Sequence, residues 1–464
     1  MNTRTKRILF ILTAVVVIAL PLQQLHIIKF RSLKGVVAEQ PIPTLTYEHW
    51  KNQRFQQGVE RHLQNHYGFR EPLTRLYNQT QWDLFHYSNL KNKGIYISDD
   101  QWYYEAMSVE EYYQGNAHRY SKDAIDMAKQ FDTEALMLYQ IQHILEAYGT
   151  HLFVLLLPGK EAIYPEHLPE NTKYFREKEI TAYDYYGKKF SEMGVNYIDV
   201  GQWFLQMKDT ADFPLFPQTG THWSNLAAMY VADSLVRYME ALGHVNLLNF
   251  SIGEKYVQTV DPDNDLEQLM NLIRPLKTAP NYFAKTEVIE DPTAKRPVLI
   301  TIGDSFYWNI LNHTPFKEIF GATPYWYYNS TVYFEEPYHN TSELDLVKEV
   351  LDADFVMLAY STTQLYKMSN GFSTRLLPRL CYDDEELRQI KTDLVENIKQ
   401  NKAWLAALQR RAEEYQIPLD TTVVHEAEYV VTHSPHIFLP ALKDSIPTRR
   451  SSAVMQYLKE QQKE

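Results

Sequence analysis

The feature that most constrains this chain is a continuous apolar run, His151 to Leu157, that ends in Pro158-Gly159. An apolar run without polar interruption is typical of a strand that is buried on both faces of a parallel sheet. Further strands are expected at 195–200, 298–302 and 355–360, with helices at about 120–148, 177–193, 224–242 and 343–351. Strands that alternate with helices predict an α/β fold with a doubly wound, mostly parallel sheet from about residue 120 to 375.

The strand at 298–302 runs directly into Gly303-Asp304-Ser305-Phe306. Proteins with α/β sheets place their sites at the carboxyl ends of strands, so Ser305 is expected at such an edge. The helix that follows offers unpaired backbone N–H groups, which stabilise a developing oxyanion. Gly303 allows a sharp turn, and Asp304 is placed to brace the loop. Because Asp and Ser are also common helix N-caps, the motif alone leaves that interpretation open.

A second motif, Thr221-His222-Trp223-Ser224, stands just ahead of the helix expected from 224. A serine hydroxyl is a poor nucleophile until a base removes its proton, and histidine is the usual base at neutral pH. His222 is therefore the candidate base for Ser305, and the bulky Trp223 is placed to fix the imidazole ring. A histidine at the surface or in a cap is the alternative, since the chain has 16 histidines.

These segments resemble the SGNH-hydrolase-like proteins of bacterial exopolysaccharide O-acetylation, the group that includes the alginate acetylation proteins. The segment at 303–306 is similar to the nucleophile block of that family, and Thr221-His222-Trp223 is similar to its base segment. Leu157-Pro158-Gly159-Lys160, followed by Tyr164-Pro165-Glu166, resembles the proline–lysine element and the tyrosine–proline pair of the family. The resemblance covers about residues 50 to 375, with motifs in the family's order and spacing.

The resemblance implies acetyl transfer through an ester on Ser305 to hydroxyl groups of a cell-envelope polysaccharide or exopolysaccharide. It also implies a donor partner, a multi-pass membrane acyltransferase that moves acyl groups across the membrane. Two alternatives stay open at this point. One is an esterase of the same fold, which would pass the acyl group to water. The other is a polysaccharide-binding or scaffold subunit with weak or no catalysis.

The chain departs from the family at Gly220, where the family has an aspartate two residues before the histidine. A triad aspartate holds the imidazole in the correct tautomer and stabilises its charged form. Its absence leaves three possibilities, which are a Ser–His dyad, a carboxylate recruited from elsewhere, or weak catalysis. Asp212, Glu335 and Glu336 are the candidates for a recruited carboxylate.

Other site candidates depend on their place in the predicted sheet. Asn329 is the side-chain candidate for an oxyanion donor, although an asparagine in a turn is the simpler interpretation. Lys160 follows a strand end and is a candidate for binding an anionic sugar, or for a lysine exposed in a loop. Tyr360 ends the last strand and is a candidate for lining the same cleft, or for packing on the sheet. We assign no ligand partners to His66, His86 and His151, so we predict no metal site and no cofactor.

The N-terminus carries Arg4, Lys6 and Arg7 ahead of an apolar run from Ile8 to Leu22, which is the pattern of an export signal or anchor. We expect an uncleaved anchor in the inner membrane of a bacterial envelope, with the body of the chain outside the cytoplasm. The net charge of −12 disfavours nucleic acid as a partner, because phosphate backbones repel an acidic protein.

The domain organisation expected from these patterns has five parts. They are a membrane anchor or signal at 1–30, a tether at 31–46, a helical and hairpin extension at 47–118, the SGNH-like α/β domain at 119–378 and a helical extension at 379–464. Within the last part, one amphipathic helix is expected over 380–415.

Overall fold

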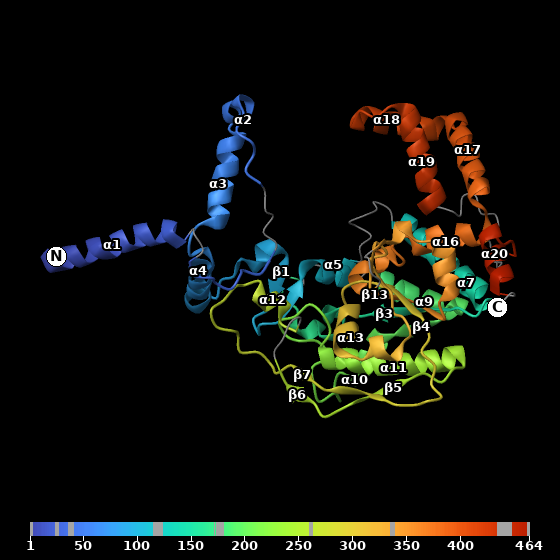
Figure 1. Cartoon of the computed structure of the whole chain (residues 1–464), viewed down its shortest axis with the longest axis horizontal. Coiled ribbons are helices and arrows are strands. Elements are labelled where there is room, and N and C mark those ends of the chain that lie inside the picture. Colours follow the sequence, from blue (N-terminus) through green and yellow to red (C-terminus); the bar gives the residue numbers. More distant parts are fainter. Residues whose placement is uncertain are drawn as a thin grey trace. The chain divides into compact units, whose positions relative to one another are not determined.

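The computed structural model describes residues 3–23, 27–35, 41–114, 124–170, 172, 181–258, 263–334, 339–433 and 448–461. The chain divides into two compact units. The N-terminal unit comprises Met1–Tyr103, Gln218–Thr221 and Asn264–Ala279, and the sheet unit comprises Tyr104–Pro217, His222–Asp263 and Pro280–Glu464. Figure 1 shows the elements of both units along the chain.

The N-terminal unit is mainly helical. Its helices are α1 (Thr3–Gln23), α2 (Tyr47–Lys51), α3 (Arg54–His66), α4 (Arg70–Phe85), η1 (Asn89–Lys93) and α12 (Asp265–Gln268). A predicted hairpin is confirmed, since β1 (Ile95–Ile97) pairs with β2 (Tyr103–Glu105). A small core forms where Leu90, Ile95 and Tyr103 meet Leu266 and Met270. Among the described residues, no helix has both the length and the apolar character needed to cross a membrane, so the predicted anchor is not confirmed.

The sheet unit is built on seven strands in the order β12-β11-β10-β9-β13-β3-β4. Their bounds are β3 His151–Leu157, β4 Tyr197–Asp199, β9 Leu299–Gly303, β10 Tyr325–Tyr327, β11 Thr331–Tyr333, β12 His339–Asn340 and β13 Phe355–Ser361. The five strands from β10 to β4 are parallel, and β11 and β12 add an antiparallel edge. The prediction of a mostly parallel sheet is confirmed, with the correction that the sheet is mixed.

Four short strands form two separate antiparallel pairs in the same unit. They are β5 (Asn249–Ile252) with β8 (Thr286–Ile289), and β6 (Tyr256–Val257) with β7 (Tyr282–Phe283). The helices of the unit are α5 Ala106–Gln114, α7 Ala124–Glu146, α8 Lys160–Ile163, η2 Pro165–His167, α9 Ala182–Met193, α10 Val200–Met207, α11 Asn225–Gly243, α13 Tyr307–His313, α14 Phe316–Ile319, η4 Thr341–Glu343, α15 Leu346–Asp352, η5 Thr362–Lys367, α16 Phe372–Cys381, α17 Asp384–Gln400, α18 Lys402–Tyr415, α19 Leu419–His433 and α20 Ser452–Gln461.

The apolar run at β3 is buried because helices cover both faces of the sheet (Figure 1). Successive strand residues point to opposite faces. Leu152, Val154 and Leu156 therefore join one core, to which α7, α9, α15 and α16 contribute. Phe153, Leu155 and Leu157 join the other core, with α10, α11, α13 and α14. This arrangement confirms the doubly wound α/β fold.

The helix expected over 380–415 is in fact two helices, α17 and α18, which meet at Asn401. Asn401 has a β-region backbone, and its side chain accepts a hydrogen bond from the backbone N–H of Trp404. An asparagine that caps the second helix in this way ends the first one. The pattern of apolar residues continues across the break, which is why periodicity alone predicts a single helix. Together with α19, the two helices enclose a separate small core.

Candidate active site

Ser305 stands two residues beyond β9, in the turn that leads into α13. β9 is the central strand of the seven, so Ser305 lies at the carboxyl end of a central strand, as predicted. Gly303 is required there by packing, because a Cβ atom would lie 2.4 Å from the carbonyl oxygen of Ala359 on β13. The glycine thus allows β9 and β13 to approach closely up to the point where the serine turn begins.

Asp304 braces this turn from inside the protein. Its Oδ1 accepts the Phe306 backbone N–H at 3.1 Å, and its Oδ2 accepts the Ser361 N–H at 2.7 Å and the Ser361 hydroxyl at 2.6 Å. Burial raises the pKa of Asp304, while the hydrogen bonds from Ser361 and Phe306 and the nearby His222 oppose that rise. The carboxyl group therefore ties the serine turn to the end of the neighbouring strand β13.

His222 is held against the same turn by its neighbour in sequence. Trp223 is fully buried, and its Nε1 donates a hydrogen bond to the Phe306 carbonyl oxygen at 3.0 Å. The Phe306 ring lies beside the imidazole, with ring centroids 5.0 Å apart. Ser224 then caps α11 by accepting the Ala227 N–H. The tryptophan thus fixes the histidine by anchoring its segment to the serine turn.

The two predicted residues meet, with His222 Nε2 and Ser305 Oγ 2.9 Å apart. Both side chains are partly buried, so the pair is shielded from bulk water but remains accessible. This distance is within the range of a hydrogen bond between a nucleophile and its base. The arrangement is suited to removal of the hydroxyl proton by the imidazole.

Behind the histidine segment lies a chain of buried polar side chains that the sequence did not reveal. Asn309 on α13 donates to Asn225 Oδ1 at 2.8 Å and to the Trp223 carbonyl oxygen at 3.4 Å. Asn225 in turn donates to Asp263 Oδ1 at 2.8 Å. All three side chains are buried. The network joins α11 to α13 and supports the backbone next to His222.

Among the proposed substitutes for the family aspartate, Asp212 is directed elsewhere. It forms an ion pair with Lys255, and its side chain is 79% exposed. Glu335 and Glu336 lie outside the described residues. Gly220, which occupies the family's aspartate position, has no side chain to supply the carboxylate.

Tyr328 is a site residue that sequence reasoning missed. It follows β10, which pairs in parallel with β9, and its backbone N–H donates to the Gly303 carbonyl oxygen at 2.9 Å. Burial raises the pKa of Tyr328, and a hydrogen-bonding interaction with the Ser305 side chain acts against that rise. The phenol is therefore protonated at neutral pH and lies beside the nucleophile. The pairing of β10 with β9, which places Tyr328 there, has no signal in the sequence.

The candidate oxyanion side chain, Asn329, is engaged in a turn. Its Nδ2 donates to the Asn370 carbonyl oxygen at 3.0 Å, and its backbone has a positive φ of 49°. Asparagine is common in this left-handed conformation, because its short polar side chain tolerates it. Its placement favours the turn interpretation, with the amide donor engaged by the Asn370 carbonyl oxygen.

Lys160 and Tyr360 are both buried. Lys160 is 3% exposed, and its Nζ donates to the Pro217 carbonyl oxygen at 3.1 Å. Tyr360 is fully buried in one of the two cores. The burial of Tyr360 agrees with the alternative that this tyrosine packs on the sheet.

The glycine of the Pro158-Gly159-Lys160 motif is explained by the residue that follows the motif, Glu161. A Cβ atom at Gly159 would lie 1.9 Å from Glu161 Oε1, so a larger residue there would displace this carboxyl group. Glu161 Oε1 accepts the Thr362 hydroxyl at 3.3 Å. Burial raises the pKa of Glu161 to about 7.

Comparison with known proteins finds a match to part of this chain. Residues 99–304 match a family model described as "SGNH hydrolase-like domain, acetyltransferase AlgX". This match confirms the resemblance inferred from the motifs. It includes His222 and ends one residue before Ser305, so the assignment of the nucleophile depends on the geometry described above.

Individual proteins are also similar to parts of this chain. The chain is 24% identical over 185 residues to a probable alginate O-acetylase AlgJ of Pseudomonas syringae pv. tomato. The matched residues make up 40% of this chain and 42% of that protein. It thus spans less than half the length of this curated relative. Among solved structures, the O-acetyltransferase domain of Pseudomonas putida AlgJ has 16% identity and a TM-score of 0.38, covering 59% of this chain and 92% of that one. Pseudomonas aeruginosa AlgX has 13% identity and a TM-score of 0.37, covering 60% and 65%.

Proposed function

We propose that this protein is a serine O-acyltransferase that transfers acetyl groups to hydroxyls of a cell-envelope polysaccharide or exopolysaccharide. The observation that carries the proposal is the 2.9 Å distance between His222 Nε2 and Ser305 Oγ, at the end of a central parallel strand. The family match and the alginate O-acetylase relative support the choice of an acetyl group and a polysaccharide acceptor.

In the first half of the reaction, Ser305 accepts the acetyl group. His222 Nε2 takes the hydroxyl proton as Ser305 Oγ attacks the acetyl carbonyl carbon, which forms a tetrahedral oxyanion. The intermediate collapses when the bond to the donor's leaving group breaks. The imidazolium returns its proton to that leaving group, and an acetyl ester remains on Ser305.

The oxyanion needs donors that are already in place before the reaction. The structure offers two groups beside Ser305 Oγ. One is the Ser305 backbone N–H, which makes no hydrogen bond within the described part of the chain. The other is the Tyr328 hydroxyl, which burial keeps protonated. We assign both to the oxyanion in place of Asn329.

In the second half, a polysaccharide hydroxyl takes the place of the leaving group. His222 Nε2 removes its proton, the oxygen attacks the ester carbonyl carbon, and the Ser305 Oγ–carbon bond breaks. The proton then passes from the imidazolium to Ser305 Oγ, so that the enzyme is restored and the sugar carries the ester. Asp304 keeps the turn rigid through both halves by its hydrogen bonds to Phe306 and Ser361.

The proposal includes a location and a donor. The basic residues and apolar run of α1 support export to the bacterial envelope, with the body of the chain outside the cytoplasm and attached to the inner membrane. Acetyl donors are made in the cytoplasm, so a multi-pass membrane acyltransferase is the partner that we propose for their delivery.

Trapping of the covalent intermediate tests the mechanism. The full-length chain is mixed with an activated aryl acetate, quenched, digested and mapped by mass spectrometry. We expect one acetyl group on Ser305 in the wild type, none at that peptide in Ser305→Ala, and normal labelling in Ser342→Ala, which alters an exposed serine. Absence of the adduct under turnover would refute the nucleophile assignment.

The acceptor half is tested with a hydroxyl-bearing oligosaccharide added to the acetylated protein. A transferase yields acetylated oligosaccharide, whereas an esterase yields only acetate. A protein that does neither, but binds polysaccharide saturably, is the scaffold subunit that remained open from the sequence.

A further inference from the structure

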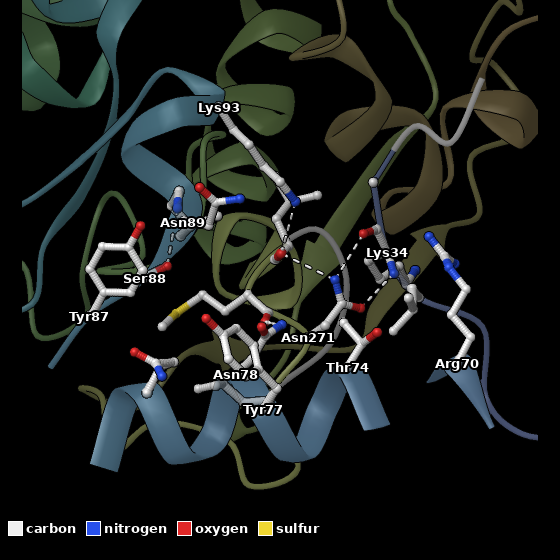
Figure 2. A pocket seen from close by; sticks show the side chains of 17 residues that line it. Lys34, Arg70, Thr74, Tyr77, Asn78, Tyr87, Ser88, Asn89, Lys93 and Asn271 are labelled. Carbon is white, nitrogen blue, oxygen red and sulfur yellow. Dashed lines mark hydrogen bonds between the residues drawn. The ribbon is translucent and has the colours of Figure 1, made fainter. Parts of the chain in front are cut away.

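The N-terminal unit contains a cavity of about 560 Å³, far along the chain from Ser305, and we call it the N-terminal pocket (Figure 2). It is enclosed by α4, by η1, by the segment 33–35 and by the loop 269–272. Its volume lies in the usual range of about 300–1,000 Å³ for small-ligand sites. The lining residues are Leu33, Lys34, Gly35, Arg70, Thr74, Tyr77, Asn78, Gln81, Tyr87, Ser88, Asn89, Leu90, Lys93, Leu269, Met270, Asn271 and Leu272.

The charge of this pocket is opposite to that of the chain. The 17 described residues that line it include Lys34, Arg70 and Lys93 but no aspartate or glutamate, although the whole chain has 58 acidic and 46 basic side chains. Within the described ranges, no carboxylate forms an ion pair with Arg70 or Lys93. A concave site that gathers charge of one sign concentrates ligands of the other sign.

Hydrogen bonds hold the backbone of Lys34 and the ammonium group of Lys93 in place before any ligand arrives. Asn271 accepts the Lys34 backbone N–H at 2.7 Å and donates to the Lys34 carbonyl oxygen at 3.0 Å. Lys93 Nζ donates to the Leu269 carbonyl oxygen at 3.4 Å, and Figure 2 shows both contacts side by side. Asn78 on α4 donates to the Met270 carbonyl oxygen at 2.7 Å, which ties the helix to the same loop. Preorganisation of this kind reduces the entropy that binding costs.

The rest of the lining has the chemistry that binds sugars. Two tyrosines, Tyr77 and Tyr87, are 62% and 50% exposed and present aromatic rings toward the pocket (Figure 2). Side-chain amides of Gln81 and Asn89 supply both donors and acceptors. Aromatic faces pack on the apolar face of a pyranose ring, and amides pair with its hydroxyls. Cations add recognition of an acidic substituent, since an arginine fork matches a carboxylate.

We propose that the N-terminal pocket binds a short segment of a carboxylated polysaccharide. The site lies in a different unit from Ser305 and His222, so it is a second glycan site, and binding there does not require acetyl transfer. Tyr77 and Tyr87 stack on the sugar rings, while Arg70, Lys34 and Lys93 receive the carboxylates.

Isothermal titration of the full-length chain with a galacturonic acid trimer tests the proposal. The neutral glucose trimer and a sugar phosphate serve as comparison ligands. We expect saturable binding of the acidic trimer that weakens as salt is added, and binding at least about tenfold weaker for the neutral trimer. If the sugar phosphate binds more tightly than the acidic trimer, the assignment of a carboxylated ligand is wrong.

Substitutions locate the binding site. Arg70→Gln and Lys93→Gln should each raise the Kd of the acidic trimer by about tenfold, because each removes a charged donor. Lys91→Gln is the matched control, since Lys91 is an exposed lysine of the same short helix η1 and does not line the pocket. Circular dichroism and thermal melts establish that each variant is folded.

The outcomes separate this proposal from the proposed catalytic function. Ser305→Ala should bind the trimer as the wild type does, and Arg70→Gln should form the acetyl adduct on Ser305 as the wild type does. Equal affinity for acidic and neutral trimers, or an equal loss in Lys91→Gln and Arg70→Gln, would overturn the pocket assignment. Loss of the adduct with intact trimer binding would overturn only the catalytic proposal.

Discussion

Replacement of Glu161 by glutamine should change how the stability of the protein depends on pH. Burial raises the pKa of this carboxyl group from 4.5 to about 7 in the folded chain. An acid whose folded pKa is raised binds more protons in the folded than in the unfolded state between these two values. The contribution of Glu161 to the unfolding free energy is therefore largest below about pH 4.5, and it is lost as the pH rises to about 7.

The magnitude follows from the two pKa values. Each pH unit of difference corresponds to about 1.4 kcal/mol, so the wild type should lose about 3 kcal/mol of unfolding free energy across this range. Glu161→Gln has nearly the same shape and keeps an oxygen that accepts the Thr362 hydroxyl. Because it cannot ionise, it should not undergo this loss.

The assay is urea denaturation at intervals from pH 4.5 to 8, followed by the fluorescence of the buried tryptophans Trp223 and Trp326. The unfolding free energy of Glu161→Gln minus that of the wild type should rise with pH up to about 7 and then stay level. A difference that is flat, or that falls with pH, would refute the account of Glu161 as a buried acid.

Glu166→Gln provides a control of opposite sign. Burial raises the pKa of Glu166, but its hydrogen bonds with Lys208 and the backbone, together with the nearby positive charges of Lys208 and His167, outweigh that effect, and the net pKa is lowered. The stabilisation that this pair supplies is present above the unfolded pKa and disappears as the pH falls through the folded one. The Glu166→Gln difference should therefore be unfavourable and nearly level from pH 8 to about 4.5, and shrink when the titration is extended below that pH.

Three further predictions concern the site itself. Turnover of an activated acetyl ester should fall by about 10³ or more in Ser305→Ala, in His222→Ala and in the double variant. Because the two residues act as a unit, the double variant should lose about as much turnover as either single variant, and additive losses would contradict this. Tyr328→Phe should lower kcat by about tenfold or more and leave KM nearly unchanged, as expected when an oxyanion donor is lost. Equal kcat values for Tyr328→Phe and the wild type would show that Tyr328 is not an oxyanion donor. Gly303→Ala should lower the unfolding free energy by about 1–3 kcal/mol, since its Cβ would meet the Ala359 carbonyl oxygen at 2.4 Å, and an unchanged urea midpoint would argue against that contact.

Much of the fold follows from the sequence, because its signals are local and periodic. The run His151–Leu157 forms β3 with the predicted bounds, and the Gly303-Asp304-Ser305 turn follows a central strand. Glycine and proline mark where such strands end, and apolar runs mark where both faces are buried. The break at Asn401 was not predicted, because a cap interrupts the backbone without interrupting the pattern of apolar residues.

The sequence also identified Ser305 and His222 as a candidate pair, through two motifs that lie 83 residues apart. Only the tertiary structure brings their side chains within 2.9 Å, and only strand pairing places Tyr328 beside them. The same holds for burial, since Lys160 and Tyr360 stand at strand ends but are covered by other parts of the sheet unit. Strand ends can be read from the chain because backbone conformation depends on neighbouring residues. The surroundings of a side chain depend on segments that are far away in sequence, so only the tertiary structure determines them.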